Sequence, residues 1–369
     1  MSAFERLFVP AAFADAVSDD AWLAAVLEVE RSLARAEAVV GVIAEEHARA
    51  IEAKCDPSGY DAGRLLEAGR APGNPVEPLV REVRGRVGGA AAGSVHLGAT
   101  SQDVLDSAAM LVSRGATALL RDELAGVAAA AAALAREHRS TPAIGRTLLQ
   151  RAVPTTFGAR AAGWLDGVLD ARDSLAALRF PAQLGGAAGT LAPLGGRALD
   201  VVAAFARELG LDEPALPWHT HRRPVTRVAA ALGESASASA KIGGDVVVLA
   251  QDDVGEVAPR EGGRSSAIPH KRNPVDAVLA RACARLTHAN VSVLSGGEYE
   301  LERAAGAWHA EWPALSAALA YAGGAAAAAR ACLEGLTIDA ERMRANLDGQ
   351  SDIGAAEMFV DRALARYEE

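Results

Sequence analysis

The feature that most limits the fold of this chain is a long proline-free run that begins at Ser101 and ends at Pro142. Ser101 is suited to cap a helix, and Asp103 would lie in the first turn, where a negative charge is favourable. At 1.5 Å per residue, this run can form a helix of roughly 55 Å. Such a helix exceeds those of ordinary globular domains, so the sequence predicts that other long helices pack along it.

Three further segments favour the same architecture. Segments 155–180 and 225–258 read as long helices, and another begins at "NPVDAVLARACARL", with Asn273 as N-cap and Pro274 at the first helical position. Aromatic residues make up only 4% of the chain. Alanine dominates, and it is the strongest helix former and a poor strand former. The predicted fold class is therefore all-α.

The segment "LGESASASAKIGGDVVVLA", which begins at Leu232, is rich in glycine, alanine and serine. Side chains of this size let two helices approach closely along their length. We interpret the segment as part of a bundle core that is shared between subunits. Exposure of these small residues on an ordinary surface is the alternative that the sequence leaves open.

The composition changes on either side of the long helices. Helical spacing of apolar residues runs from Asp19 to about Lys54, whereas residues 57–98 are rich in glycine, proline and asparagine, which suits loops and short helices. After Gly335 only a short piece remains. The sequence therefore predicts three parts, at residues 1–98, 99–335 and 336–369.

Charge and cysteine content exclude several classes of protein. The net charge of −10 and the pI near 5.4 argue against nucleic acid or an anionic membrane as partner, since both require a broad basic face. The three cysteines have neither disulfide nor zinc-site spacing, which predicts no bound metal. The longest uncharged apolar stretch, Leu124–Ala135, is too short to span a bilayer. We expect a cytoplasmic protein.

One stretch contrasts with the acidic composition. "RSSAIPHKRNP", from Arg264 to Pro274, follows Gly262 and Gly263 and holds adjacent serines and several basic side chains. It leads into a helix N-terminus, where free N–H groups and a partial positive charge favour anions, and Lys271 and Arg272 add full charges. A loop that closes over a carboxylate ligand is the prediction. A solvated basic turn before a capped helix is the plainer alternative.

Two other segments also set polar groups among glycines. They are "SVHLGATSQD", with His96, Thr100 and Ser101, and "TPAIGRTLLQRAVPTTFG", with Arg146, Thr147 and Gln150. The first lies just before a helix start, where an anion is favoured, and the second is too elaborate for a plain turn. Together with the basic loop, they predict a site assembled from distant segments.

These motifs carry a family resemblance. "SSAIPHKRNP" resembles the signature loop of the fumarase and aspartase superfamily, and "HLGATSQD" and "GRTLLQRAVPTTFG" are similar to its other two shared regions, in the usual order. "FGARAAGWL", "LGGAAGTLAPLG", "PWHTHR" and "ERAAGAWHAEWPAL" are similar to the bacterial 3-carboxy-cis,cis-muconate cycloisomerases. The likeness covers nearly the whole chain.

The resemblance implies a homotetramer whose long central helices form one bundle, with each active site drawn from three subunits. It implies a small polycarboxylate substrate, lactonisation of 3-carboxy-cis,cis-muconate, and no metal or organic cofactor. It identifies Ser265 as the residue that handles the carbon-bound proton, with Lys271 and His96 as the other catalytic residues. The substrate-binding residues that it implies are Thr100, Ser101, Arg146, Thr147, Gln150, Arg222, Ser266 and Asn273.

Leu148 departs from the superfamily's lyases, in which the third motif commonly reads Gly-Arg-Thr-His. Expelling an amine requires a proton on the leaving atom, which a leucine cannot deliver. A lactonising enzyme has no such need, because its nucleophile is a carboxylate that is already ionised at pH 7. Leu148 therefore favours ring closure over amine elimination.

Other departures concern substrate choice. Arg264 stands where the family loop usually has glycine, and Arg223 and Pro224 follow Arg222 where an aspartate is usual. The candidates for an accessory role in protonation or binding are His219, His221 and His309, each of which suits a structural role better. Two other functions stay open: a lyase for a succinyl-type substrate such as adenylosuccinate, and a non-catalytic oligomeric scaffold.

Overall fold

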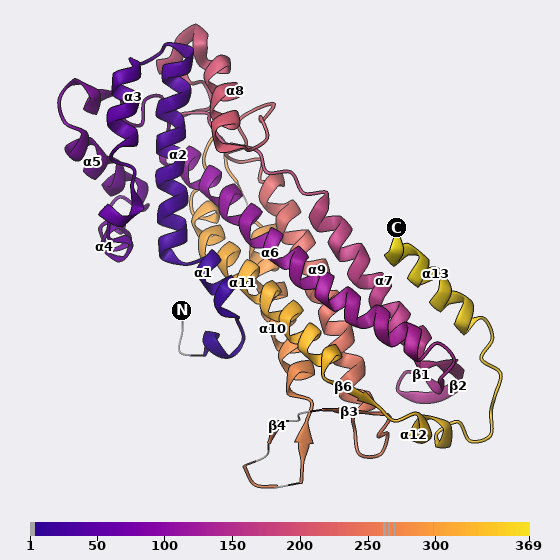
Figure 1. Ribbon diagram of the computed structural model, residues 1–369. Coiled ribbons are helices and arrows are strands. Elements are labelled where there is room, and N and C mark those ends of the chain that lie inside the picture. The colour runs from indigo at the N-terminus through magenta and orange to yellow at the C-terminus, as the bar shows by residue number, and fades with distance from the viewer. Residues whose placement is uncertain (1–3, 261–262, 265, 269, 298) are drawn as a thin grey trace.

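The computed structural model describes residues 4–260, 263–264, 266–268, 270–297 and 299–369. It is an elongated bundle of long helices with smaller elements at both ends (Figure 1). The long helices are α6 (Ser101–Glu137), α7 (Phe157–Ala176), α9 (Arg223–Leu249), α10 (Val275–Ser295) and α11 (Ala307–Glu334). The prediction of an all-α fold is confirmed. Among the described helices, none has the length and apolarity required to cross a membrane.

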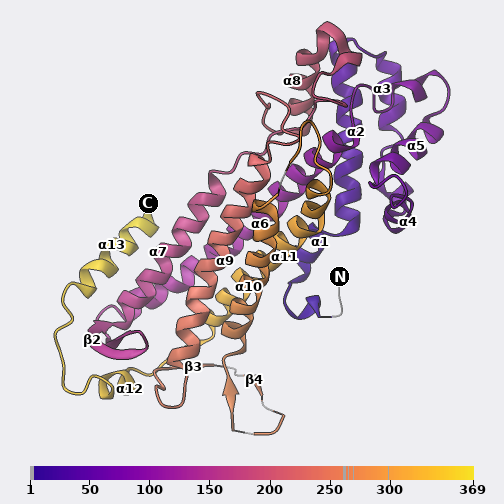
Figure 2. The same cartoon turned by 180° about the vertical axis from the view of Figure 1, so that it is seen from behind.

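One end of the bundle carries the N-terminal helices, and the other carries the C-terminal helices and the strands (Figures 1 and 2). The N-terminal group and its neighbours are α1 (Ala11–Ala16), α2 (Asp19–Val40), α3 (Glu45–Glu52), α4 (Ala62–Ala68), α5 (Val76–Val87) and α8 (Ala198–Leu209), with 3-10 turns η1 (Glu5–Leu7), η2 (Pro57–Gly59), η3 (Ala90–Ser94) and η4 (Ala192–Arg197). The C-terminal helices are α12 (Ala340–Ala345) and α13 (Ala356–Glu368). The division at residues 98 and 335 stays a prediction.

Within the described residues, three two-stranded antiparallel sheets complete the fold. They pair β1 (Pro142–Thr147) with β2 (Gln150–Thr156), β3 (Val257–Pro259) with β6 (Leu336–Ile338), and β4 (Gly263–Arg264) with β5 (Arg272–Asn273). The helix predicted over 225–258 ends earlier, at Leu249, because the chain turns and enters β3. The segment with the third motif is the β1–β2 hairpin.

Two predicted helix caps are wrong by one residue. Thr100, not Ser101, caps α6: Thr100 has an extended backbone, and its N–H donates to the Asp103 carboxylate at 3.0 Å. Pro274, not Asn273, precedes α10, because Asn273 pairs with Gly263 in the β4–β5 ladder. The physical reason in the second case is that the ring of a proline disfavours helical geometry for the residue before it.

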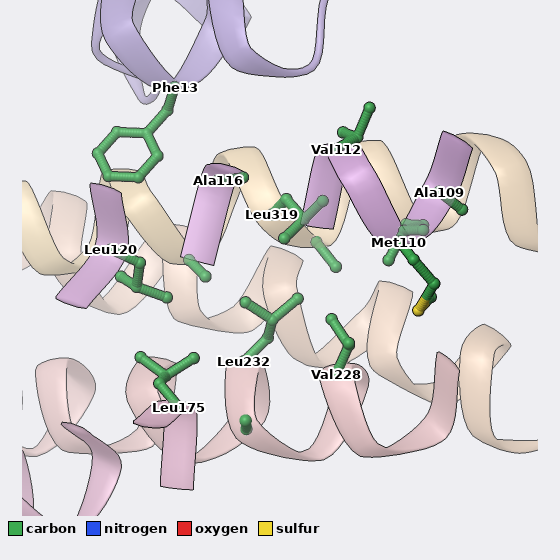
Figure 3. Packing of buried hydrophobic residues seen from close by; sticks show 14 of the residues in the cluster. Phe13, Ala109, Met110, Val112, Ala116, Leu120, Leu175, Val228, Leu232 and Leu319 are labelled. Atoms are coloured by element: carbon green, nitrogen blue, oxygen red, sulfur yellow. The ribbon is translucent and has the colours of Figure 1, made fainter. Parts of the chain in front are cut away.

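The core lies between α6, α7, α9 and α11, where Met110, Leu120, Leu232 and Leu319 are among the buried side chains (Figure 3). Small residues bring the backbones together, as predicted. A Cβ added to Gly243 of α9 would lie 2.5 Å from the Ala277 carbonyl oxygen of α10. These contacts lie within one chain, so the sharing of the bundle between subunits stays a prediction.

Candidate active site

The segment "SVHLGATSQD" lies at the N-terminal end of α6 and centres on His96. The backbone of His96 has φ 61°, a left-handed conformation that is uncommon for residues other than glycine. Its Nδ1 lies 2.6 Å from Oε1 of Glu30, a fully buried carboxylate on α2. Burial by itself lowers the pKa of His96, but the charge and hydrogen bond of Glu30 outweigh it, and the pKa is raised. The pair therefore favours the cationic imidazolium beside the start of α6.

Thr100 belongs to the same end of α6, and it has a partner that the sequence interpretation missed. Nη1 of Arg303 donates to the Thr100 hydroxyl at 2.8 Å, and Nη2 of Arg303 donates to the Ala187 carbonyl at 3.1 Å. A second cation thus joins His96 at a helix N-terminus, where anions are favoured. The signal for Arg303 in the sequence was its place in the pair Glu302–Arg303, which opens the segment "ERAAGAWHAEWPAL" that carries part of the family resemblance.

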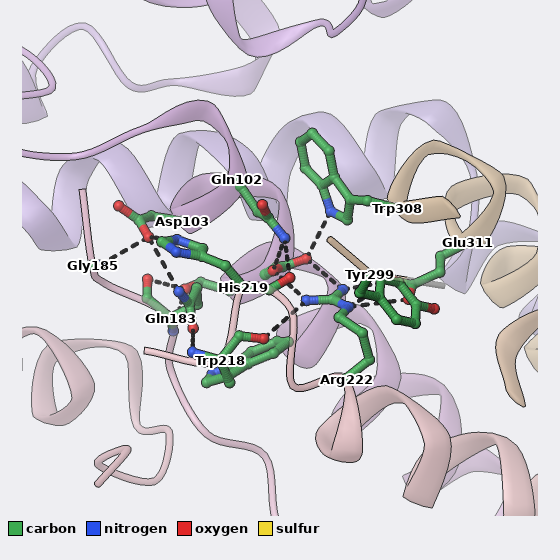
Figure 4. Close-up of polar contacts among 12 residues, drawn as sticks. Gln102, Asp103, Gln183, Gly185, Trp218, His219, Arg222, Tyr299, Trp308 and Glu311 are labelled. Carbon is green, nitrogen blue, oxygen red and sulfur yellow. Dashed lines mark hydrogen bonds and ion pairs between the residues drawn. The ribbon is translucent and has the colours of Figure 1, made fainter. Parts of the chain in front are cut away.

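A buried polar network supports this end of α6 (Figure 4). Asp103 accepts hydrogen bonds from the backbone N–H groups of Gly185 and Gly186 at 2.9 and 2.8 Å. Its Oδ1 also lies 2.7 Å from Nε2 of His219. His219 is buried, so its contacts agree with the structural role that the sequence favoured. His221 and His309 are exposed.

Arg222 lies in the same network, and its predicted contact with substrate stays a prediction. Its guanidinium donates to Asp106 at 2.6 and 2.8 Å and to Glu311 at 2.6 and 3.0 Å (Figure 4). Only 4% of Arg222 is exposed. Trp308 donates to Asp106, and Tyr299 donates to Glu311. Since both carboxylates occupy the guanidinium, the geometry favours a supporting role for Arg222 over contact with a substrate.

The third motif lies on the β1–β2 hairpin. Arg146, close to the turn of the hairpin, is held by a bidentate ion pair with buried Glu256, at 2.6 and 3.0 Å, and Asn346 also donates to Glu256 at 2.8 Å. The guanidinium of Arg146 therefore anchors the hairpin in this chain, and its predicted contact with substrate stays a prediction. Thr147 and Gln150 pair with each other and are exposed on either side of the turn.

The tip of this hairpin consists of Leu148 and Leu149. Both are in the left-handed region, with φ of 49° and 65°, and they are 96% and 72% exposed. Turns of this type favour Asn-Gly, because each central residue needs a positive φ. Leu148 is almost fully exposed, whereas Leu149 lines a cavity together with Arg160 and Lys241.

The basic segment "RSSAIPHKRNP" contains the loop between β4 and β5. Ser265, the predicted proton donor, lies outside the described residues. Ser266 and Lys271 are exposed, and Asn273 donates from Nδ2 to the Gly263 carbonyl at 3.4 Å. A Cβ at Gly263 would lie 2.2 Å from the Val275 side chain, so glycine is required where the loop begins.

A single chain does not bring all three motifs together. His96, Thr100 and Ser101 adjoin the start of α6, whereas the hairpin follows its end, and the 37 residues between them span roughly 55 Å. The β4–β5 loop lies at the hairpin's end of the bundle (Figure 1). A site that contains all three motifs therefore requires segments from more than one copy.

Comparisons with known proteins identify the family. Residues 9–287 match the family described as lyase (Lyase_1). The chain is 49% identical to a nitrosuccinate lyase of Streptomyces davaonensis over 90% of its own length and 74% of that protein. It is 42% identical to a 3-carboxy-cis,cis-muconate cycloisomerase of Bradyrhizobium diazoefficiens, over 96% and 81%.

The fold agrees with these relatives. The structure of 3-carboxy-cis,cis-muconate lactonizing enzyme from Pseudomonas putida superposes with a TM-score of 0.92 at 32% identity, over 99% of both chains. Sequence motifs, helix arrangement and family match therefore point the same way, and the chain belongs to the lyase family of the fumarase and aspartase superfamily.

Proposed function

We propose that this protein is a cycloisomerase that closes 3-carboxy-cis,cis-muconate into 4-carboxymuconolactone without a metal or organic cofactor. The observation that carries the proposal is Leu148, exposed at the hairpin tip where the superfamily's lyases commonly have a histidine, together with several relatives and a solved structure named for ring closure. The hairpin thus presents a hydrocarbon to the site in place of a proton donor. Relatives named for this reaction support the assignment.

Ring closure matches what the site retains. A substrate carboxylate attacks the double bond and forms the carbon–oxygen bond, so no base is required, since this carboxylate is ionised at pH 7. The electron pair of the double bond moves toward the neighbouring carboxylate and gives an enolate-like intermediate. A proton on the α carbon then completes the lactone. The reaction therefore requires cations, hydrogen-bond donors and one acid.

The described and predicted residues divide these tasks. His96, with Arg303 and Thr100 beside it, supplies positive charge at the N-terminus of α6, where Ser101 lies in the first turn. In the proposal, Lys271, Ser266 and Asn273 stabilise the intermediate from the loop of another copy, and Ser265 donates the proton. Losing one well-placed donor of this kind typically slows a reaction by about a hundredfold or more.

A direct assay tests this function. Purified protein mixed with 3-carboxy-cis,cis-muconate should bleach the ultraviolet absorbance of the diene. Ser265→Ala should slow the bleaching by roughly a hundredfold or more, with an unchanged melting temperature. An unchanged rate in this variant removes Ser265 from the mechanism, and no bleaching by the wild type removes the proposed reaction.

A second candidate is a nitrosuccinate lyase, and the relative at 49% identity favours it. Nitrite leaves as a stable anion, as a carboxylate does, so this elimination also needs no acid at position 148. Incubation with nitrosuccinate separates the candidates, because a lyase releases nitrite and a cycloisomerase does not. An adenylosuccinate-type lyase would need another acid, such as His96. A folded oligomer that turns over none of these substrates would favour the scaffold alternative.

A further inference from the structure

A cavity of about 500 Å³ opens between α2, α4, α5 and α11, away from the three motifs. Its walls are largely apolar and include Leu65, Leu79 and Leu105. This volume lies within the range of about 300 to 1,000 Å³ that is typical of small-molecule sites. None of the predicted site residues that the structure describes lines it, so it is separate from the described part of the candidate active site.

Two tryptophans form part of the wall, and they differ in their hydrogen bonds. The indole of Trp22 on α2 donates from Nε1 to the Ser316 hydroxyl at 2.9 Å, which fixes its ring. Trp312 on α11 packs edge-to-face against Trp308, with ring centroids 4.8 Å apart. Nε1 of Trp312 is buried and has no acceptor among the described residues. This N–H is closed off by the protein around it, so the face of the Trp312 ring, not its donor, is what the indole offers to the cavity.

The rim of the cavity adds a cation. Arg70 is exposed in the turn after α4, and within the described part of the chain its side chain has no ion pair. Arg70 is a charged donor beside apolar walls, so the complementary ligand is an anionic acceptor with an apolar body. Asp19, which also lines the cavity, disfavours a second negative charge.

We propose that this cavity binds an aromatic monocarboxylic acid. The ring packs against Trp22 and Trp312, which offer flat apolar surfaces. The carboxylate pairs with Arg70. This class differs from the polycarboxylate expected at the active site, because a second carboxylate would be buried among leucines without a partner. The inference does not depend on the proposed function.

The probe for the test is 2-naphthoate, added to the purified full-length protein. Quenching of tryptophan fluorescence and isothermal titration calorimetry should both show saturable binding at one site per chain. The uncharged 2-naphthamide should bind at least tenfold more weakly, since it cannot form the ion pair. The dianion naphthalene-2,6-dicarboxylate should also bind at least tenfold more weakly than 2-naphthoate.

Matched variants locate the site. Arg70→Ala should weaken the binding of 2-naphthoate at least tenfold and leave the binding of 2-naphthamide unchanged. Arg81 is an exposed arginine of α5 outside the cavity, so Arg81→Ala should change the binding of neither compound. Ala62→Trp should fill the cavity and abolish binding with an unchanged melting temperature and turnover.

Three outcomes overturn the proposal. One is a folded wild type that shows no saturable binding, and another is equal weakening by Arg70→Ala and Arg81→Ala. The third is binding that Ala62→Trp leaves intact but carboxymuconate displaces, since the probe would then occupy the active site. Loss of oligomerisation in Ala62→Trp, together with no binding by the wild type, would identify a second copy as the occupant instead.

Discussion

The two ends of α6 differ in how completely their groups are satisfied. At the N-terminal end, Asp103 and Asp106 are buried, and each accepts several hydrogen bonds from neighbouring elements. Beyond the other end, Leu148 and Leu149 are exposed and left-handed. The comparison shows that charged residues near a motif can be scaffold, whereas the apolar side chains of the hairpin tip are left largely to solvent in a single chain.

The energetics of the two ends are opposite. The network is stable only as a complete set, because a buried charge without a partner costs several kcal/mol. The tip is locally unfavourable, since a left-handed backbone costs roughly 1 to 2 kcal/mol for a residue other than glycine. A tip that keeps two leucines despite this cost suggests contact with another copy.

The largest expected effect comes from breaking the network. Arg222→Met leaves Asp106 and Glu311 without their shared cation, and we expect about 3 to 5 kcal/mol less free energy of unfolding, measured in urea. Arg223→Met, at the exposed neighbouring position, serves as control and should change it by about 0.5 kcal/mol or less. A loss below about 1 kcal/mol in Arg222→Met would contradict the role that we assign to the network.

A second effect concerns Glu37 on α2, which is fully buried and has no hydrogen-bond partner for either carboxyl oxygen among the described residues. Burial, with a smaller contribution from the charge of Glu30, raises its pKa to about 9. Between the unfolded value of 4.5 and this value, the folded state binds more protons. The contribution of Glu37 to the free energy of unfolding is therefore fully present below pH 4.5 and is lost as the pH rises toward 9.

The slope from this one group should be about 1.4 kcal/mol per pH unit. Glu37→Gln cannot ionise, so the fall in its free energy of unfolding between pH 6 and pH 8.5 should be smaller than that of the wild type. Glu45→Gln, at an exposed position, should retain the wild-type slope. Parallel curves for wild type and Glu37→Gln would show that this carboxyl is already ionised in the folded protein.

The hairpin tip gives a smaller effect of opposite sign. Replacing both leucines, as Leu148→Asn with Leu149→Gly, supplies the residues that the turn favours and should stabilise the isolated fold by about 1 to 2 kcal/mol. If the tip contacts a neighbouring site, lactonisation should nevertheless slow at least tenfold. A variant with full activity would show that the leucines serve no partner.

The sequence predicted the long helices well, because proline-free alanine-rich runs leave few alternatives. It also placed His96 and Thr100 beside a helix start. It did not reveal that Arg222 is buried between Asp106 and Glu311, since these residues lie far apart in the sequence and only packing joins them. Glu30 and Arg303 were missed for the same reason, as their roles depend on contacts with His96 and Thr100.

The smallest change in stability, and the most specific one, is expected from Glu30→Gln. The groups that act on the His96 imidazole are Glu30 on α2, Asp103 on α6 and Arg84 on α5. The variant keeps a hydrogen bond but removes the charge, so burial and Arg84 lower the pKa of His96 with only Asp103 opposing them. An NMR titration should show this fall, whereas Glu28→Gln, two residues earlier on α2 and half-buried, should show none.

The sign of the functional effect follows from the protonation state. The raised pKa keeps the imidazolium and its ion pair in the folded wild type, a contribution that is fully present below the unfolded value of 6.5 and is lost as the pH rises through the folded value. The KM of Glu30→Gln for the carboxylate substrate should therefore exceed that of the wild type near pH 7 and approach it at lower pH, while kcat changes less. An equal rise in KM at every pH would mean that Glu30 positions His96 without controlling its charge.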